Sequence, residues 1–236
     1  MANISTPKYL WFFILSYTMV LAFANWFDAR LVDIQGIITD AGTLIFPLSF
    51  LLADIITEVY GYKNTRTAIW CGFLFNILFV AYGQLVIHLP SPPYPNYNHL
   101  FNQILDLNVR IIIASFISYF ISEPLNSIIV AKLKIKMQGK RMWFRFVLST
   151  IIASGFDSFM FSWIAFWGLI QAKEIWALLL TMWAIKVVIE IIGLPLSTRL
   201  ARKLKTLEHQ DIYDTKTSFT LFSLDQKYSE ENNHYK

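Results

Sequence analysis

Long apolar runs alternate with short polar connections along the chain. A helix that crosses a membrane needs about 20 mainly apolar residues, and it satisfies its backbone hydrogen bonds internally, as a lipid environment requires. The pattern therefore predicts six membrane-spanning helices. They are expected at residues 9–27, 42–60, 67–89, 111–130, 146–171 and 175–200.

The connections differ from one another in character. The lead-in to the second run, VDIQGIITDAGT, contains Gly and Asp, so a short re-entrant or interfacial segment can precede that helix. The connection at residues 90–108 contains Pro92, Pro93 and Pro95, which predict a non-helical loop over the outer mouth of the helices. Residues 206–236 are polar and predict a cytoplasmic tail that is partly disordered, after a transmembrane domain at residues 1–205.

Composition agrees with the apolar runs. Hydrophobic residues make up 56% of the chain and charged residues only 15%, against about 25% charged residues in soluble domains. The predicted fold is an all-α integral membrane protein with six transmembrane helices in one compact bundle. The single Cys71 excludes an intrachain disulfide, and the four histidines are too scattered to ligate a metal. No cofactor is expected.

Basic residues gather at one set of predicted helix ends. Only Arg30, Arg110 and Lys173 lie at the opposite ends. Because loops on the cytoplasmic side carry the excess of Lys and Arg, both termini are predicted to be cytoplasmic, which requires an even number of spans. The thirteen residues of the basic set are Lys8, Lys63, Arg66, Lys132, Lys134, Lys136, Lys140, Arg141, Arg145, Arg199, Arg202, Lys203 and Lys205.

The second run carries two carboxylates inside an otherwise apolar helix. Asp54 and Glu58 are four residues apart and share one helix face. Charges within a membrane are costly and usually face a polar cavity or one another. Glu58 also has a purely structural alternative, because it lies near the cytoplasmic end and can meet Lys63 or Arg66.

Further ionisable residues lie in the last three runs. Lys186 and Glu190 repeat the spacing of four with opposite charges and can form an ion pair. Glu123 and Asn126 are three apart and share a face, and Asp157 lies in mid-span with no sequence neighbour that neutralises it. So many buried polar groups in one small protein predict a polar cavity.

Asp157 has aromatic neighbours, Phe159 and Trp163, that can enclose a planar ligand. Carboxylates beside aromatic faces suit a flat heterocycle that donates hydrogen bonds through N–H groups. A guanine-like base has this chemistry, because its ring N–H and exocyclic amine can meet one carboxylate together. The sequence predicts Asp157 as the main contact of such a base and Glu123 as the second.

The stretch GTLIFPLSFLLADIITEVYGYKNTR resembles the signature of the queuosine precursor transporter family, also called the vitamin uptake transporter family. The basic loop KLKIKMQGKRMWFR, the pair Ser149 and Thr150 and the tail HQDIYDTKTSFTLF extend the resemblance over nearly the whole chain. The chain departs from the family at Glu123 and Ser154, where Gln is usual, and at Asn126, where Asp is usual. The signature positions are Gly42, Phe46, Pro47, Leu48, Asp54, Glu58, Tyr60 and Gly61.

The resemblance implies an inner-membrane importer of 7-cyano-7-deazaguanine, 7-aminomethyl-7-deazaguanine or queuine, for salvage into tRNA queuosine. Its partners would be the small-molecule base and the lipid bilayer, with no direct contact to nucleic acid and an oligomeric state that stays open. The residues expected to bind substrate or line the transport path are Asp54, Glu58, Glu123, Asn126, Asp157, Lys186 and Glu190.

Two alternatives remain at this level. The substrate-binding subunit of an energy-coupling-factor vitamin importer also uses six short spans, and it requires separate ATPases. An intramembrane enzyme is the other alternative, in which Asp54, Glu58 and Asp157 would hold Mg²⁺ and a diphosphate. The chain lacks a DDxxD-type cluster, so the sequence favours a transporter and not an enzyme.

Overall fold

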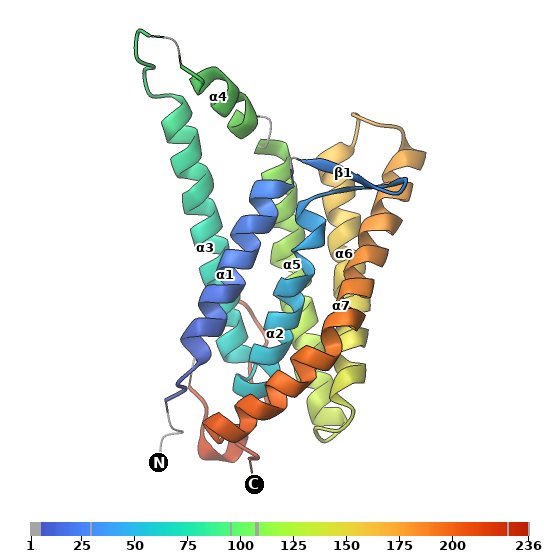
Figure 1. Ribbon diagram of the computed structural model, residues 1–236. Coiled ribbons are helices and arrows are strands. Elements are labelled where there is room, and N and C mark those ends of the chain that lie inside the picture. The colour runs from blue at the N-terminus through green and yellow to red at the C-terminus, as the bar shows by residue number, and fades with distance from the viewer. Residues whose placement is uncertain (1–5, 29, 95, 107–108, 226, 236) are drawn as a thin grey trace.

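The structure, a computed structural model, describes residues 6–28, 30–94, 96–106, 109–225 and 227–235. Within these residues, six helices are long and apolar enough to cross a membrane, which confirms the predicted number. They run side by side, and both ends of the chain lie at the same end of the molecule (Figure 1). The six are α1 (Leu10–Phe27), α2 (Pro47–Tyr60), α3 (Tyr62–Ile87), α5 (Val109–Lys136), α6 (Met142–Phe166) and α7 (Ala172–Glu208).

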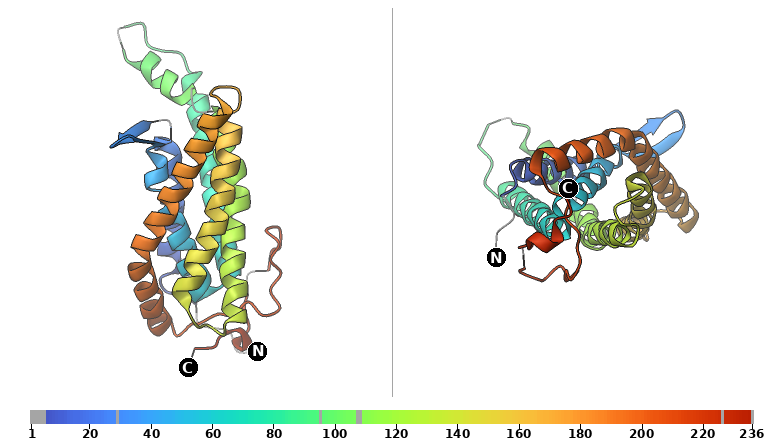
Figure 2. Two further views of the ribbon diagram at one scale, coloured as in Figure 1. Left: turned by 90° about the vertical axis from the view of Figure 1, so that its right-hand side faces the viewer. Right: turned by 90° about the horizontal axis from the view of Figure 1, so that it is seen from below.

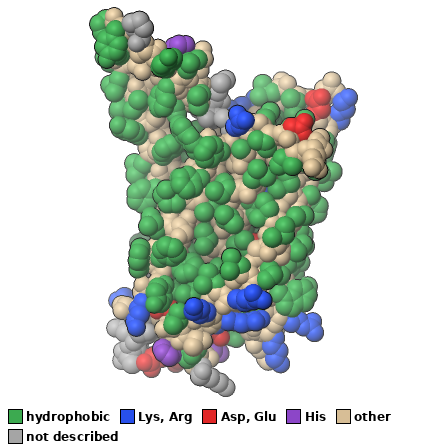
Figure 3. Space-filling view, viewed as in Figure 1, with side chains coloured by type: hydrophobic (Ala, Val, Ile, Leu, Met, Phe, Trp, Pro, Cys, Tyr) green, Lys and Arg blue, Asp and Glu red, His purple; other side chains and the backbone are tan. Residues whose placement is uncertain are grey.

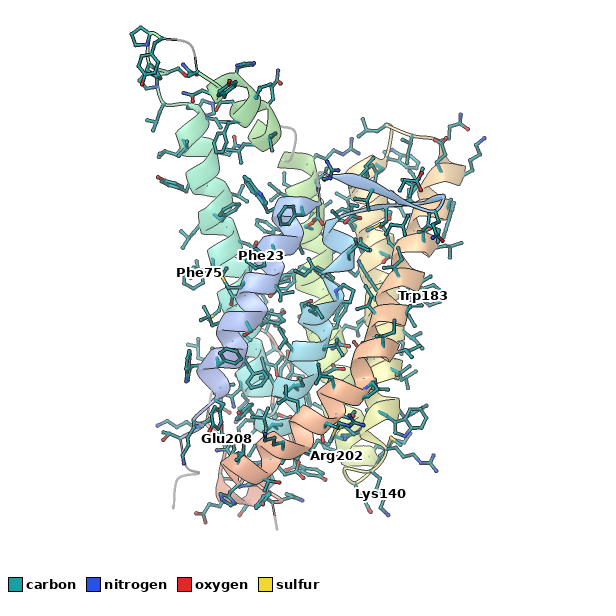
Figure 4. The ribbon with its side chains drawn as sticks, viewed as in Figure 1. Phe23, Phe75, Lys140, Trp183, Arg202 and Glu208 are labelled. Carbon is teal, nitrogen blue, oxygen red and sulfur yellow. The ribbon has the colours of Figure 1, made fainter. Side chains whose placement is uncertain are left out.

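The outer surface is that of a multi-pass membrane protein. Apolar side chains cover the sides of the helices, and Lys and Arg side chains gather near the termini (Figure 3). Phe23 and Phe75 project outward from α1 and α3, whereas Lys140 and Arg202 mark the end with the termini, which we call the basic end (Figure 4). The side of the membrane that this end faces stays a prediction.

Helix α2 is the central element. It contacts each of the other five spanning helices, and it lies among them when the molecule is seen from the basic end (Figure 2). Twelve of its 14 residues are buried. Pro47 stands in its first turn, where a missing N–H costs nothing. The carboxylates of this helix are therefore surrounded by protein and not by lipid.

The prediction of an all-α protein is wrong at residues 31–40, which form an antiparallel hairpin of β1 (Leu31–Ile34) and β2 (Ile37–Asp40). The turn residues Gln35 and Gly36 both have positive φ, 55° and 87°. Positive φ at both positions gives the tight turn that matches the twist of two antiparallel strands. The hairpin and the 3-10 turn η1 (Gly42–Leu44) lead into α2 at the end opposite the basic end, which we call the hairpin end (Figure 1).

The prediction that the loop at residues 90–108 is non-helical is also wrong. Helix α4 (Asn98–Asp106) occupies its second half. Proline restricts only its own position and the residue before it, so Pro92 and Pro93 do not prevent a helix that begins at Asn98, and Pro95 lies outside the described residues. The backbone N–H of Asn98 donates to Asn96 Oδ1 (3.0 Å), which supports the start of the helix.

The tail is packed and not disordered in its described part. Helix α7 extends past the predicted boundary to Glu208, whose carboxylate accepts hydrogen bonds from the Tyr60 hydroxyl (2.8 Å) and the backbone N–H of Tyr9 (2.8 Å). Beyond it, Lys63 Nζ contacts Asp225 Oδ2 at 2.5 Å, and the Arg66 guanidinium donates to backbone carbonyls of the tail. Polar groups of the tail thus make contacts with the basic end.

Candidate functional site

Polar side chains fill the space where α2, α5, α6 and α7 face one another. On α6 they recur every three to four residues, which places them on one helix face. Small hydroxyl residues let the helices approach closely and supply hydrogen bonds where water is absent. The buried polar residues of this column are Ser49, Asp54, Ser122, Glu123, Asn126, Thr150, Ser154, Asp157, Ser158, Lys186 and Glu190.

An ion pair between α6 and α7 stands in the half of the column near the hairpin end. Lys186 Nζ lies 2.5 Å from Asp157 Oδ2, and both side chains are about 4% exposed. The second carboxylate oxygen of Asp157 accepts a hydrogen bond from the Ser122 hydroxyl (3.0 Å). Lys186 Nζ also lies 4.8 Å from the centre of the Phe46 ring, a cation–π contact.

The prediction that Lys186 pairs with Glu190 is therefore wrong, as is the view that Asp157 lacks a counter-charge. The spacing of four along α7 permits an ion pair on one helix. Packing brings the opposite charge from α6 to Lys186 instead, and no hydrogen bond joins the Glu190 carboxylate to Lys186 in the described part of the chain.

A small cavity adjoins this ion pair. Its volume of about 20 Å³ is enough for roughly one water molecule and far below the roughly 300 Å³ of a small-molecule pocket. The helices would have to move apart before a molecule larger than water could enter, so the column is closed in this conformation. The residues that line the cavity include Asp28, Phe46, Ser115, Asp157, Phe161 and Lys186.

Two carboxylates at the hairpin end escaped sequence reasoning. Asp28 accepts a hydrogen bond from the Ser115 hydroxyl at Oδ2 (3.1 Å), and the buried Asp40 accepts from the backbone N–H of Thr43 (2.5 Å). A Cβ atom at Gly42 would stand 1.7 Å from Asp28 Oδ1, so only glycine lets the two segments meet. Asp28 and Asp40 were missed because they lie just outside the apolar runs. The signature residue Gly42, two positions after Asp40, is the sequence signal that could have pointed to this segment.

The middle of the column holds three more carboxylates. Asn126 Nδ2 donates to Asp54 Oδ1 (2.6 Å), and the Ser49 hydroxyl donates to Glu123 Oε1 (2.6 Å). The second oxygens of Asp54 and Glu123 have no hydrogen-bond partner among the described residues, and neither oxygen of Glu190 has one. We call Asp54, Glu123 and Glu190 the central carboxylate cluster.

Glu58 lies one turn of α2 beyond Asp54, in a network of charges at the basic end. Arg145 Nη2 is 2.9 Å from Glu58 Oε2, and Lys205 Nζ is 2.6 Å from Oε1. The expected contact of Glu58 with Lys63 or Arg66 does not form, because the tail engages those two side chains. Glu58 thus ties α2 to α6 and α7.

The tail joins this network through Asp211. Its Oδ1 atom lies 2.6 Å from Lys134 Nζ and 2.8 Å from Lys205 Nζ. Burial raises the pKa of Asp211, but the two ammonium groups outweigh burial and hold that pKa below its ordinary value. The charged form of Asp211 therefore stabilises the docked tail.

We expect Asp211→Asn to lower the stability of the protein by about 1.5–3 kcal/mol at neutral pH, the scale of a charge-assisted hydrogen bond. A carboxyl group with a lowered folded pKa contributes fully above its unfolded pKa of about 3.9 and loses that contribution as pH falls through the folded pKa. Thermal unfolding in detergent at neutral pH and below about pH 3 checks this. A difference between variant and wild type that persists unchanged in acid would contradict it.

The aromatic pair next to Asp157 in sequence does not enclose the site. The Phe159 side chain is 43% exposed, and it packs in a cluster with Trp163 and Trp176. Phe46 and Phe161 line the cavity instead. A residue two positions from Asp157 on a helix points about 200° away from it, which is why the neighbour in sequence is not the neighbour in space.

Within the described residues, no group of three or more His, Cys, Asp or Glu side chains is arranged to hold a metal ion. Asp54, Glu58 and Asp157, the set that the enzyme alternative requires, divide among the central carboxylate cluster, the basic end and the Lys186 ion pair. The buried polar side chains form a column between the helices and not a metal site.

The residues of the signature described above occupy defined positions in and beside this column. Phe46 contacts Lys186, and Asp54 belongs to the central carboxylate cluster. Gly61 has φ of 81° and turns the chain from α2 into α3. A side chain there would be strained and would also collide with Tyr228.

The chain is similar in sequence to proteins named as transporters. Residues 40–200 match the family described as "Putative vitamin uptake transporter". The "Probable queuosine precursor transporter" of Bacillus subtilis (strain 168) is 26% identical over 176 residues, which are 73% of this chain and 76% of that protein. No solved structure matches the chain.

Two further relatives carry similar names. The "Queuosine precursor transporter" of Escherichia coli (strain K12) is 26% identical over 163 residues, 68% of this chain and 70% of that protein. The "Probable queuosine precursor transporter" of Haemophilus influenzae is 33% identical over 127 residues, 53% of this chain and 51% of that protein. Because the family match at residues 40–200 covers more than half of the chain, this protein belongs to the vitamin uptake transporter family.

Proposed function

We propose that this protein imports 7-deazaguanine precursors of queuosine across the inner membrane for salvage into tRNA. Family membership supports a transporter and not an enzyme, and the names of the three relatives support the class of cargo. The observation that carries the proposal is the buried Asp157–Lys186 ion pair beside the Phe46 ring. These groups match a planar base that both donates and accepts hydrogen bonds.

The recognition chemistry follows from the two charged groups. A carboxylate accepts two roughly parallel hydrogen bonds, and the ring N–H and exocyclic amine of a guanine-type edge supply them to Asp157. The carbonyl oxygen on the same edge accepts a hydrogen bond from Lys186, while the ring packs on Phe46. Adenine lacks this order of donors and acceptors and would leave the charges poorly matched.

The remaining polar residues form the rest of the proposed path. Asp54, Glu123, Asn126 and Glu190 lie between this ion pair and the network around Glu58. In our proposal the hairpin end faces the outside, and the basic end with both termini faces the cytoplasm. The base passes from the hairpin end to the basic end. Each group along the way offers the hydrogen bonds that the base loses on leaving water.

Uptake in cells that lack their own synthesis and transport of these bases tests the proposal. The cells receive a labelled base, 7-cyano-7-deazaguanine, 7-aminomethyl-7-deazaguanine or queuine, and tRNA queuosine is measured. We expect queuosine only when this protein is expressed. Equal amounts of queuosine with and without the protein would overturn the proposed function.

Asp157→Asn is expected to lower uptake by about tenfold to a hundredfold at matched amounts of membrane protein. An amide offers one acceptor oxygen and places a donor where the base needs a second acceptor, and a lost charge-assisted hydrogen bond costs about 1.5–3 kcal/mol. Asp33 on β1 is an exposed carboxylate, so Asp33→Asn is the matched control and leaves uptake unchanged. Full uptake by Asp157→Asn would show that the base binds elsewhere in the column.

Glu123→Gln restores the residue that is usual at this position of the family signature. The amide keeps an acceptor for the Ser49 hydroxyl, which bonds Glu123 Oε1 at 2.6 Å. We therefore expect Glu123→Gln to weaken binding of the base less than Asp157→Asn does, and to change the preference among the three precursors. Competition between the three bases for uptake measures that preference.

A further inference from the structure

The central carboxylate cluster has an unusual charge balance. Asp54 and Glu123 are fully buried and Glu190 is 1% exposed. Within the described part of the chain, no lysine, arginine or histidine forms an ion pair with any of the three. The cations that lie nearest along the column are committed elsewhere, Lys186 to Asp157 and Arg145 to Glu58.

Three buried carboxylates cannot all stay ionised without a counter-charge. The cost of burying one isolated carboxylate is high enough that such a group takes up a proton instead, and a neighbouring carboxylate increases that cost. Glu190 is close enough to interact electrostatically with Asp54 and Glu123. A proton bound to any one of the three therefore lowers the negative charge of the whole cluster.

The hydrogen bonds leave defined places for a proton. Asn126 holds one oxygen of Asp54 and Ser49 holds one oxygen of Glu123, so the opposite oxygen of each acid is open. Both oxygens of Glu190 are buried and have no hydrogen-bond partner of regular geometry among the described residues, with the Thr150 hydroxyl as a neighbour. A buried carboxylate oxygen without a hydrogen-bond partner can bind a proton without breaking an existing hydrogen bond.

We propose that Asp54, Glu123 and Glu190 form a proton-binding site that couples movement of the base to a proton gradient. This inference rests on the proposed function as a transporter. The cluster joins α2, α5 and α7, so a change in its charge acts on the contacts between three helices. A proton binds to a carboxylate oxygen from the outer side, and the same proton leaves to the cytoplasm when the path opens inward.

The neighbours of the cluster define what else can titrate with it. The described groups that face it from the packed helices are Tyr17 on α1, Glu58 on α2, Tyr119 on α5, Asp157 on α6 and Lys186 on α7, with Cys71 of α3 beside Tyr119. Glu58, Asp157 and Lys186 have partners of opposite charge. Among the described residues, the three carboxylates of the cluster have no such partner, so a proton bound there changes the net charge of the column without breaking an ion pair.

The purified protein in liposomes without ATP tests this proposal. Labelled 7-cyano-7-deazaguanine is followed in two assays, exchange of labelled for unlabelled base without a gradient, and accumulation driven by a pH gradient with a more alkaline lumen. If one proton accompanies each base, a gradient of one pH unit supports up to about tenfold accumulation. A fluorescent pH indicator in the lumen reports whether the base brings protons with it.

We expect wild-type protein to accumulate the base under the pH gradient and to acidify the lumen. Glu190→Gln and Asp54→Asn are tested as two separate variants. Each should lose most of the accumulation driven by the pH gradient, compared with the rate at which the same variant exchanges base without a gradient, because an amide cannot release a proton. Glu174 on α7 is exposed, so Glu174→Gln is the matched control and should behave as wild type.

The outcomes separate this inference from the proposed function. Absence of exchange by the wild-type protein would overturn the proposed function. Exchange without any response to the pH gradient, or accumulation that follows a sodium gradient instead, would overturn the proton site alone. Accumulation under the pH gradient that both Glu190→Gln and Asp54→Asn retain in full would place the proton outside the central carboxylate cluster and overturn its assignment.

Discussion

Lys186→Met lowers the stability of the folded protein by about 3–5 kcal/mol, the cost of leaving one partner of a buried ion pair without the other. Lys186 Nζ is 2.5 Å from Asp157 Oδ2, and both side chains are about 4% exposed. The double variant Lys186→Met with Asp157→Asn removes both charges and recovers most of the loss. Thermal unfolding in detergent and the amount of inserted protein measure the difference.

Uptake by the double variant distinguishes a structural ion pair from a binding site. If the pair only holds α6 against α7, transport returns together with stability. In our proposal Asp157 and Lys186 contact the base, so the double variant folds but does not transport. A double variant as unstable as Lys186→Met alone would contradict the pairing, and one that transports normally would contradict the assignment of the base to this site.

The spanning helices were predictable because each one depends on its own stretch of sequence and not on contacts with the rest of the chain. Each apolar run is long enough to cross a membrane by itself, and the predicted and observed helices overlap in all six cases. The hairpin at residues 31–40 was missed because ten mixed residues next to apolar runs carry little signal. Its turn at Gln35 and Gly36 and its β-branched residues were the available evidence.

The partners within the column were not predictable because they depend on packing. The spacing of Lys186 and Glu190 indicates a shared helix face, but it does not say which other helix faces them. The structure places Asp157 of α6 against Lys186 and leaves Glu190 with Asp54 and Glu123. Sequence reasoning therefore found the charged residues in the middle of the column and paired Lys186 with the wrong carboxylate.

The same distinction applies to the basic end. The excess of Lys and Arg there predicted an orientation, and the sequence indicated no partner within the protein for most of these residues. Arg145 and Lys134 are instead fully or almost fully buried. Lys134 Nζ donates to the backbone carbonyl of Ile212 in the tail (2.6 Å). Part of the charge asymmetry thus belongs to contacts within the protein.

Glu58→Gln is expected to lower stability by about 3–5 kcal/mol. Arg145 is fully buried, forms its ion pair with Glu58 at 2.9 Å, and cannot lose its proton to relieve an unpaired charge. Lys134 and Lys205 keep Asp211 as a partner when Glu58 is neutral. The exposed tail residue Glu231 offers the control, since Glu231→Gln leaves the unfolding temperature unchanged.

The double variant Glu58→Gln with Arg145→Met shows which role Glu58 has. If Glu58 acts only by holding Arg145 between α2 and α6, removal of both charges restores the unfolding temperature and uptake of the base together. If Glu58 also lies on the transport path, stability returns while uptake stays low. A single variant with wild-type stability would show that Arg145 finds another partner, and the network at the basic end would then not depend on Glu58.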